Sequence, residues 1–443
     1  MDIKLITSFD ILYSIVLLFI IFYYANNVKR KNIVEQPSFK YFTKGLFIKI
    51  FGAISFCLIY ALYYKGGDTV NYFKGVNAMF NAFKHDPFKY FVMIFNSDTK
   101  YARHLFWDAG IFPPGYMLRD PRTFLVIKLS SVISLVGLGG FLPTTILLAS
   151  LVYNWVWKLF DFMYTRYPKH QKEVVIAILY LPSTIFWGSG IMKDTFTFAA
   201  TCYTVYGLHT LFILRERKLK VILQLIFSFY LIITIKSYII FALLPGLLIF
   251  ANFERLKSIK SIFVKIFIIP ISIVALIFVS KSVFIDFSDL FGKYSADRIL
   301  EEAAIQNADL QRSVYGENSF NIGEFEPSLQ GVLAKIPVAI NAAIFRPYIW
   351  EVGTPTMWLS GIENLLILIL TVWLIITRPF SIFKIFKDPF LIFCLLFTLI
   401  LGFGIGLSTS NFGALVRYKI PFLPFFLFLI FVLLQKDKKK KVT

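Results

Sequence analysis

The sequence PFLIFCLLFTLILGFGIGL, residues 389–407, contains no charged residue and is long enough to cross a lipid bilayer as one helix. The chain has 443 residues, and 57% of them are hydrophobic, against roughly 45–50% in soluble domains. Further apolar runs suited to spanning lie at 8–26, 46–64, 141–160, 172–190, 195–214, 219–235, 238–252, 262–282, 359–377 and 418–435. Such runs differ from the alternating strands, about ten residues long, of a membrane β-barrel. We therefore predict an all-α, polytopic integral membrane protein.

The number of spans depends on residues 123–138, a shorter apolar run that contains Lys128 and three serines. Short loops rich in Lys and Arg stay on the cytoplasmic side of a membrane. The basic clusters of this chain all share that side only if 123–138 does not cross. We therefore predict eleven spans, with the N-terminus outside, the C-terminus inside, and 123–138 as an interfacial or re-entrant helix. If that run crosses, there are twelve spans, and the loop around Asp68 becomes cytoplasmic.

In the eleven-span arrangement, residues 1–443 form a single transmembrane domain whose two longest loops, 65–122 and 283–357, lie on the outer face. The first loop contains two stripes of apolar residues at helical spacing. The stripes are Val70, Phe73, Val76, Met79, Phe80 and Phe83, then Phe88, Phe91, Val92 and Phe95. They predict amphipathic helices, which lie either at the membrane surface or against the protein's own core.

The charge balance and the rarer residue types exclude several classes of function. A net charge of +20 is typical of a membrane protein with basic cytoplasmic loops, and we expect no nucleic-acid partner. The three cysteines all lie inside apolar runs, which does not indicate a disulfide framework. The four histidines lack the spacing of a metal site. The Lys- and Phe-rich composition indicates a bacterial protein, for which we expect a multi-pass location in the inner membrane.

Asp68 follows Gly66 and Gly67 at the outer end of the second apolar run. Charge near membrane depth is costly and is usually functional or paired. Asp68 therefore fits two roles. It is either an N-cap for a helix that begins near Thr69, or a general base or metal ligand.

A second polar pair, Lys193 and Asp194, follows the run 172–190. Pro182 is expected to kink this run, because proline removes a helical hydrogen bond. The pair fits a helix break followed by an N-cap. It equally fits a cation that binds phosphate together with a second acid.

Two arginines with aromatic neighbours lie near the outer ends of the last apolar runs. Arg346 precedes Tyr348 and Trp350, and Arg417 precedes Tyr418. Aromatic faces and a guanidinium group bind sugars and phosphates, which would make these residues parts of a substrate site. The alternative is that they anchor the chain at the membrane interface or snorkel toward it.

These segments together resemble the GT-C glycosyltransferases. The motifs that carry the resemblance are Gly67-Asp68 with Tyr72, Lys193-Asp194, and Arg417-Tyr418 with Pro421 and Pro424. Members of that family transfer a sugar from a polyprenyl-phosphate donor at the outer face of the membrane. In them the first-loop acid acts as catalytic base or metal ligand, and the late arginine faces the lipid phosphate. Many members carry an Asp-Glu or Glu-Asp pair where Asp68 stands alone, so a bound divalent metal stays an open alternative.

The resemblance implies a glycosyltransferase that moves a sugar from a polyprenyl-phosphate-linked donor to an envelope glycan, lipid or protein. Asp68 would activate the acceptor, and Trp350 would stack on sugar. Lys193 or Arg346, together with Arg417, would hold the phosphate. The remaining members of the expected substrate-binding set are Tyr72, Asp194 and Tyr418.

Two alternatives remain. The layout also resembles O-antigen-type polysaccharide polymerases, whose substrates are glycans linked to polyprenyl pyrophosphate. A transporter or flippase for a lipid-linked or anionic substrate belongs to another class, and it would carry charges near the middle of its spans. Lys236 and Glu363 are the candidates for such charges.

Overall fold

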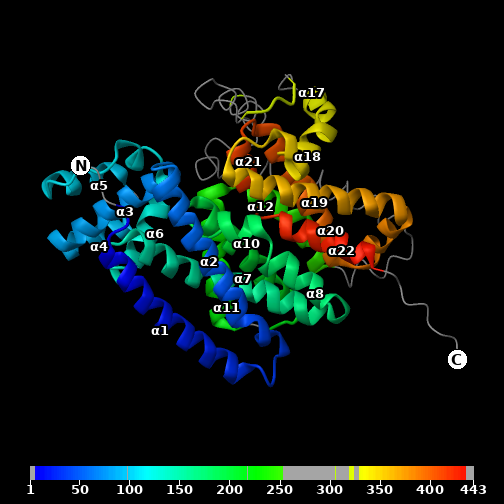
Figure 1. Ribbon diagram of the computed structural model, residues 1–443, viewed down its shortest axis with the longest axis horizontal. Helices are drawn as coiled ribbons and strands as arrows, with labels where there is room; N and C mark the ends of the chain where they lie inside the picture. The colour runs from blue at the N-terminus through cyan, green and yellow to red at the C-terminus, as the bar shows by residue number, and fades with distance from the viewer. Residues whose placement is uncertain are drawn as a thin grey trace. The chain divides into compact units, whose positions relative to one another are not determined.

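The computed structural model describes residues 5–96, 98–216, 218–252, 305, 319–323 and 329–435 (Figure 1). Within these ranges the regular structure is helical, and the one extended pairing is an isolated bridge between Ser319 and Asn411. The all-α prediction is confirmed for this part of the chain. The predicted span 262–282 and most of the first half of the loop 283–357 lie outside the described residues.

The chain divides into two compact units. The first comprises Met1–Thr165 and Thr184–Tyr203, and the second comprises Arg166–Ser183 and Thr204–Thr443. Helices of the first unit are α1 (Ser8–Asn32), η1 (Pro37–Tyr41), α2 (Phe42–Leu58), η2 (Ile59–Tyr63), α3 (Asp68–His85), α4 (Pro87–Phe95), α5 (Thr99–Asp108), η3 (Gly115–Leu118) and α6 (Pro121–Val136). Three helices contribute residues to both units: α7 (Phe141–Arg166), α9 (Pro182–Trp187) and α10 (Lys193–Leu208).

The second unit holds the remaining described helices. They are η4 (Pro168–His170), α8 (Gln171–Val174), η5 (Val175–Leu179), η6 (His209–Ile213), α11 (Leu219–Lys236), α12 (Tyr238–Ala251), α17 (Leu329–Ala334), α18 (Ile336–Phe345), η9 (Ile349–Glu351), α19 (Pro355–Thr377), η10 (Pro379–Lys387), α20 (Pro389–Ser408), α21 (Phe412–Tyr418) and α22 (Leu423–Leu434).

Seven helical segments of the described residues are long and apolar enough to cross a membrane. They are Ser8–Asn32, Pro37–Tyr63, Phe141–Arg166, Lys193–Ile213, Leu219–Lys236, Pro355–Thr377 and Pro389–Ser408. The pair α21 and α22, bent by 67°, makes an eighth if it is one broken span. The chain is therefore a multi-pass helical membrane protein, as predicted, although the described residues do not reach the predicted eleven spans.

Two of the predicted runs depart from simple spans for local reasons. The run 172–190 is interrupted between Leu179, where η5 ends, and Pro182, where α9 begins. Proline has no N–H to donate to the preceding turn, and its ring clashes there, so the expected kink becomes a complete break. The run 238–252 forms α12, which has 14 residues and falls short of the roughly 20 that a bilayer requires.

In the first unit, α3 packs against α6 and α4 (Figure 1). Val70, Phe73, Val76 and Met79, which form most of the first apolar stripe, are buried. Gly75 allows the approach, because a Cβ there would lie only 2.7 Å from the Ile127 side chain. This stripe therefore faces the protein's own core rather than the membrane surface.

The core of the second unit is centred on α20, which packs against α12, α18 and α22. Aromatic rings fill this region, with Phe393 beside both Phe397 and Phe425. Gly246 of α12 packs directly against Phe393, and Gly406 of α20 packs against the main chain of Ala339. Because lipid tails are as apolar as side chains, helices in membranes associate through the close packing that small residues such as these glycines allow.

Candidate functional site

The predicted site residues fall into two groups. Asp68, Tyr72, Lys193 and Asp194 belong to the first unit. Arg346, Trp350, Arg417 and Tyr418 belong to the second unit.

Asp68 is the first residue of α3, and its side chain is exposed. The cap position is occupied by Gly67, whose φ of 96° is a conformation that favours glycine. The cap position offered as one alternative for Asp68 therefore belongs to Gly67, because the helix begins at Asp68 rather than near Thr69. A carboxylate in the first turn is stabilised by the positive end of the helix dipole. Tyr72 lies one turn later on the same face, since residues four apart are neighbours on a helix.

Lys193, the first residue of α10, forms an ion pair with Asp120, with 2.7 Å between the Lys193 amine and Asp120 Oδ2. Asp120 also caps α6, because its carboxylate accepts hydrogen bonds from the Arg122 N–H at 3.1 Å and the Thr123 hydroxyl at 2.8 Å. Burial raises the pKa of Asp120, but the Lys193 amine and these two donors outweigh it and hold the pKa below its usual range. A phosphate at Lys193 would share the amine with this carboxylate.

Asp120 was not among the sequence candidates, although its signal is present. An Asp followed by Pro121 and then by Thr123 is a typical helix start, with the acid as cap and proline in the first turn. Asp194 is buried in the first turn of α10, one residue after Lys193. Lys193 and Asp194 therefore both lie at the start of α10, and Asp120, the cap of α6, pairs with the lysine.

Lys49, within the first unit, is a buried cation that the sequence analysis did not select. Its amine donates hydrogen bonds to the carbonyls of Gly188 at 2.5 Å and Thr184 at 3.3 Å. It also lies 5.5 Å from the centre of the Phe198 ring. The amine thus binds one carbonyl within α9 and one just after it, in the segment that leads to Lys193. A lysine inside the apolar run 46–64 was the available signal, because charge at membrane depth is seldom without a role.

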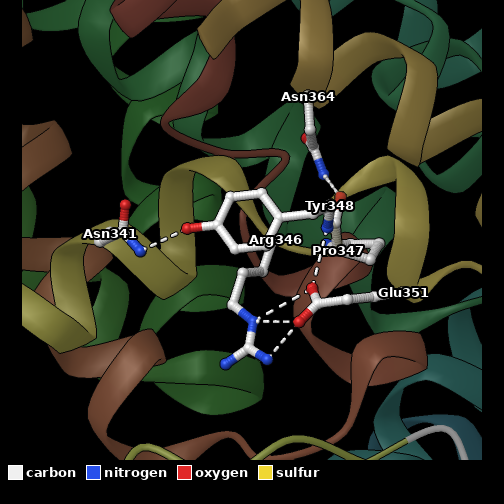
Figure 2. A network of polar contacts seen from close by, with 6 residues as sticks. All are labelled: Asn341, Arg346, Pro347, Tyr348, Glu351 and Asn364. Atoms are coloured by element: carbon white, nitrogen blue, oxygen red, sulfur yellow. Dashed lines mark hydrogen bonds and ion pairs between the residues drawn. The ribbon is translucent and has the colours of Figure 1, made fainter.

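Arg346 of the second unit is held by Glu351 (Figure 2). Its Nε lies 2.9 Å from Glu351 Oε1 and 3.1 Å from Oε2, and its Nη2 also donates to Oε1. Glu351 additionally accepts a hydrogen bond from the Tyr348 backbone N–H at 2.9 Å. The guanidinium group lies over the Phe320 ring, 4.5 Å from its centre. In this conformation the guanidinium is already bound to a carboxylate, and a phosphate would compete with Glu351.

Trp350 is 73% exposed and stacks on Tyr348, with 4.9 Å between ring centres and 20° between ring planes. The Tyr348 hydroxyl accepts a hydrogen bond from the Asn341 side chain at 2.6 Å, and Figure 2 shows this contact. Arg346, Glu351 and Asn341 together fix the turn that carries both rings. The result is a rigid aromatic pair with one ring exposed.

Lys419 lies beneath this turn and is fully buried. Its amine donates to Asn364 Oδ1 at 2.5 Å, to the Arg346 carbonyl at 3.2 Å and to the Ile344 carbonyl at 3.4 Å. Asn364 in turn donates to the Pro347 carbonyl at 3.1 Å, as Figure 2 shows. Lys419 therefore ties the end of α18 to α19 and to the break between α21 and α22.

Glu363, one residue before Asn364, is also buried, and its Oε2 accepts a hydrogen bond from the Ser183 backbone N–H at 2.8 Å. The Glu363 carboxylate, a candidate mid-span charge in the sequence, therefore has a hydrogen-bond partner inside the protein. The positive charge of Lys419 also interacts electrostatically with the Glu363 carboxylate.

Arg417 and Tyr418 form the end of α21, just before the chain bends toward α22. Asn411 caps α21, with its side chain accepting from the Ala414 N–H at 3.1 Å. The Lys236 amine lies 3.9 Å from the centre of the Tyr418 ring, a cation–π contact. The late Arg-Tyr sequence therefore lies at a helix break.

In the described ranges no three His, Cys, Asp or Glu side chains gather into a group suited to a metal ion. Comparison with known proteins finds no matching family model, no matching curated protein and no matching solved structure. The likeness to GT-C glycosyltransferases thus depends on the sequence motifs alone.

Proposed function

We propose that this protein is a membrane glycosyltransferase. It moves a sugar from a polyprenyl-phosphate-linked donor to an envelope glycan, lipid or protein acceptor on the outer face of a bacterial inner membrane. We also propose the eleven-span topology, which puts Asp68 on that face. The observation that carries the proposal is the fixed aromatic pair Tyr348 and Trp350 beside the Arg346–Glu351 ion pair. An exposed indole face next to guanidinium and carboxylate groups suits the C–H face and hydroxyls of a sugar.

The proposed reaction is a displacement at the anomeric carbon of the donor sugar. The acceptor oxygen forms a bond to this carbon while the bond from the carbon to the phosphate oxygen breaks. Asp68 takes the proton of the acceptor hydroxyl, and the bonding electrons leave with polyprenyl phosphate. Arg417, with Lys193 or Arg346, stabilises the charge on the departing phosphate. The exposed carboxylate of Asp68 suits a base that must meet an acceptor.

Lys193 and Arg346 each have a carboxylate partner, Asp120 and Glu351. In the proposed cycle the donor phosphate draws the cation from this partner. Until then the carboxylate keeps the side chain in place, so less side-chain entropy is lost when the donor binds.

Two other functions remain candidates. An O-antigen-type polymerase would use the same displacement on a glycan linked to polyprenyl pyrophosphate. A transporter or flippase for a lipid-linked or anionic substrate is favoured by a specific observation, since Glu363 and Lys236 are buried within or at the end of spans.

The test uses the purified full chain in proteoliposomes that contain polyprenyl-phosphate-linked tritiated hexoses and lipid or oligosaccharide acceptors. The proposal expects single-sugar transfer to an acceptor together with release of free polyprenyl phosphate. A ladder of products from a pyrophosphate-linked glycan would establish the polymerase instead. Movement of the lipid-linked sugar to the other leaflet, with no bond broken, would establish the transporter and overturn the proposal.

A further inference from the structure

Helix α4 of the first unit has apolar side chains on two opposite faces. Tyr90 and Met93 are buried, and the Tyr90 hydroxyl lies 3.1 Å from the Ser131 hydroxyl of α6. On the other face Phe88, Phe91 and Phe95 are 78%, 47% and 85% exposed. One face therefore fixes the helix to the protein, and the other presents a stripe of bare aromatic rings.

The exposed stripe borders an open groove of about 580 Å³, lined by Phe88, Phe91, Val92, Phe95 and Asn96. The end of α4 is held firmly beside it. The Lys128 amine of α6 donates to the Asn96 carbonyl at 2.5 Å and to the Ile94 carbonyl at 3.4 Å. The groove thus belongs to a helix that is anchored at its C-terminal end as well as along its buried face.

The next helix, α5, adds charge and a second type of aromatic residue. Ala102, Leu105 and Phe106 are buried on its inner side. Lys100, Arg103 and Trp107 are exposed, and their spacing of three and four places them along one stripe of the helix. Trp107 is 71% exposed. Basic residues beside an interfacial tryptophan are typical of surfaces that meet lipid headgroups.

These features lie outside the seven spanning segments, in the stretch between Tyr63, where one span ends, and Phe141, where the next begins. A loop that is surrounded by water alone seldom exposes so much contiguous apolar surface. The segment is joined at both ends to spanning segments, so it stays close to the membrane. Lys100 and Arg103 complement lipid phosphates, while Asp108 of α5 lies 4.0 Å from the Lys89 amine of α4.

We propose that Phe88, Phe91, Phe95, Lys100, Arg103 and Trp107 form a lipid-docking surface. The three phenylalanines enter the upper hydrocarbon layer of the bilayer, and the groove beside them accommodates one lipid acyl chain. Lys100 and Arg103 lie at the level of the phosphates, and Trp107 lies at the interface. This surface is independent of the proposed sugar transfer, and it would exist in a transferase, a polymerase or a transporter.

The test places a fluorescent NBD label on α4 in the full-length protein. Phe88→Cys and Phe95→Cys variants are labelled and reconstituted in vesicles of phosphatidylcholine and phosphatidylglycerol, and Asn81→Cys on the exposed polar face of α3 is the control. The native Cys57, Cys202 and Cys394 are buried, which favours labelling of the introduced thiol. Lipid brominated at carbons 6 and 7 should quench the labels on α4 at least about twofold more than the control label, because those positions enter the acyl layer.

A second arm keeps the phenylalanine stripe intact, so it does not depend on how well the α4 variants fold. A label on His104→Cys should be quenched more by brominated phosphatidylglycerol than by brominated phosphatidylcholine. The added pair Lys100→Gln and Arg103→Gln should remove this preference, because the cations select anionic headgroups.

Two results would overturn the proposal. The first is quenching of the α4 labels by aqueous iodide as strong as at Asn81→Cys, which would mean that water covers the stripe. The second is protection from both iodide and brominated lipid, which would mean that another protein or a second copy of this chain covers it.

Discussion

At the scale of single residues, Lys419 organises the polar part of the second unit. Its amine donates hydrogen bonds to three oxygen atoms, those of the Asn364 side chain and of the Ile344 and Arg346 carbonyls. Two of these oxygens are carbonyls at the end of α18, where the helix leaves its last carbonyls without internal partners. The lysine therefore caps α18 from a distant part of the chain, and it fixes the turn that carries Tyr348 and Trp350.

Replacing Lys419 by methionine should destabilise the protein by about 1–3 kcal/mol, because buried oxygens lose their donor while the volume of the side chain is kept. Thermal unfolding in detergent measures the effect. The matched control is Lys387→Met, since Lys387 is exposed in the same unit. Equal stability of the two variants would show that the Lys419 contacts contribute nothing.

The Asp120–Lys193 ion pair predicts a dependence of stability on pH. The folded-state pKa of Asp120 is held below its usual range. Folding therefore favours the ionised carboxylate. Its stabilisation is fully present above the unfolded-chain pKa of about 3.9, and it is lost as the pH falls through the lower folded-state value.

The measurement is the unfolding midpoint in detergent between about pH 6 and about pH 3, a range that brackets the ordinary pKa of aspartate. Wild-type protein should lose more stability on acidification than Asp120→Asn, which cannot ionise. Parallel pH profiles of the two proteins would contradict the role given to the pair.

At the scale of helices, the close crossing of α18 and α20 depends on Gly406. A Cβ at this position would lie 2.6 Å from the Ala339 carbonyl carbon and closer still to its oxygen. Because the obstacle is main chain, it cannot turn aside as the end of a side chain can. Gly404, half a turn away on the same helix, faces open space.

We expect Gly406→Ala to cost about 1–3 kcal/mol in unfolding free energy, the usual range for overpacking. Gly404→Ala should be neutral or slightly stabilising, because alanine is about 1 kcal/mol better than glycine in a helix. Denaturant or thermal unfolding of both variants gives the comparison. If Gly406→Ala were as stable as Gly404→Ala, the two helices would not cross at this point.

The sequence patterns predicted where helices form better than they predicted what packs against each helix. Both stripes of the first loop form helices, but only packing distinguishes them: the stripe from Val70 to Met79 is buried against α6, while the stripe from Phe88 to Phe95 is exposed. Periodicity reports that one face is apolar, and it does not say whether protein or lipid covers that face. The break before Pro182 was predicted only as a kink. Proline disrupts the preceding turn, but it does not by itself decide whether the helix bends or is fully interrupted.

The site was predictable only in part, for a related reason. Lys193 and Arg346 were selected as cations, but their partners Asp120 and Glu351 were not. Lys193 and Asp120 are 73 residues apart, and such pairing depends on the tertiary fold. Lys49 and Lys419 carried a readable signal as charges inside apolar runs, yet the carbonyls that they bind have no signature in the sequence.

At the scale of the whole molecule, the topology decides which side of the membrane holds Asp68. The eleven-span arrangement predicts that a cysteine at Arg119 reacts with an impermeant maleimide from outside sealed cells. A cysteine at Lys218 should react only after the membrane is opened, because its loop is rich in Lys and Arg. Labelling of both positions from the same side would show that residues 123–138 cross, and Asp68 would then be cytoplasmic.

The central claim is that Asp68 is the base in a sugar transfer. The most direct test is the rate of polyprenyl-phosphate release in proteoliposomes by Asp68→Asn, beside Asp108→Asn as an exposed acid of the same unit. The account predicts that Asp68→Asn loses at least about a hundredfold in rate, the usual contribution of a general base, while Asp108→Asn keeps the wild-type rate. Full activity of Asp68→Asn would contradict it.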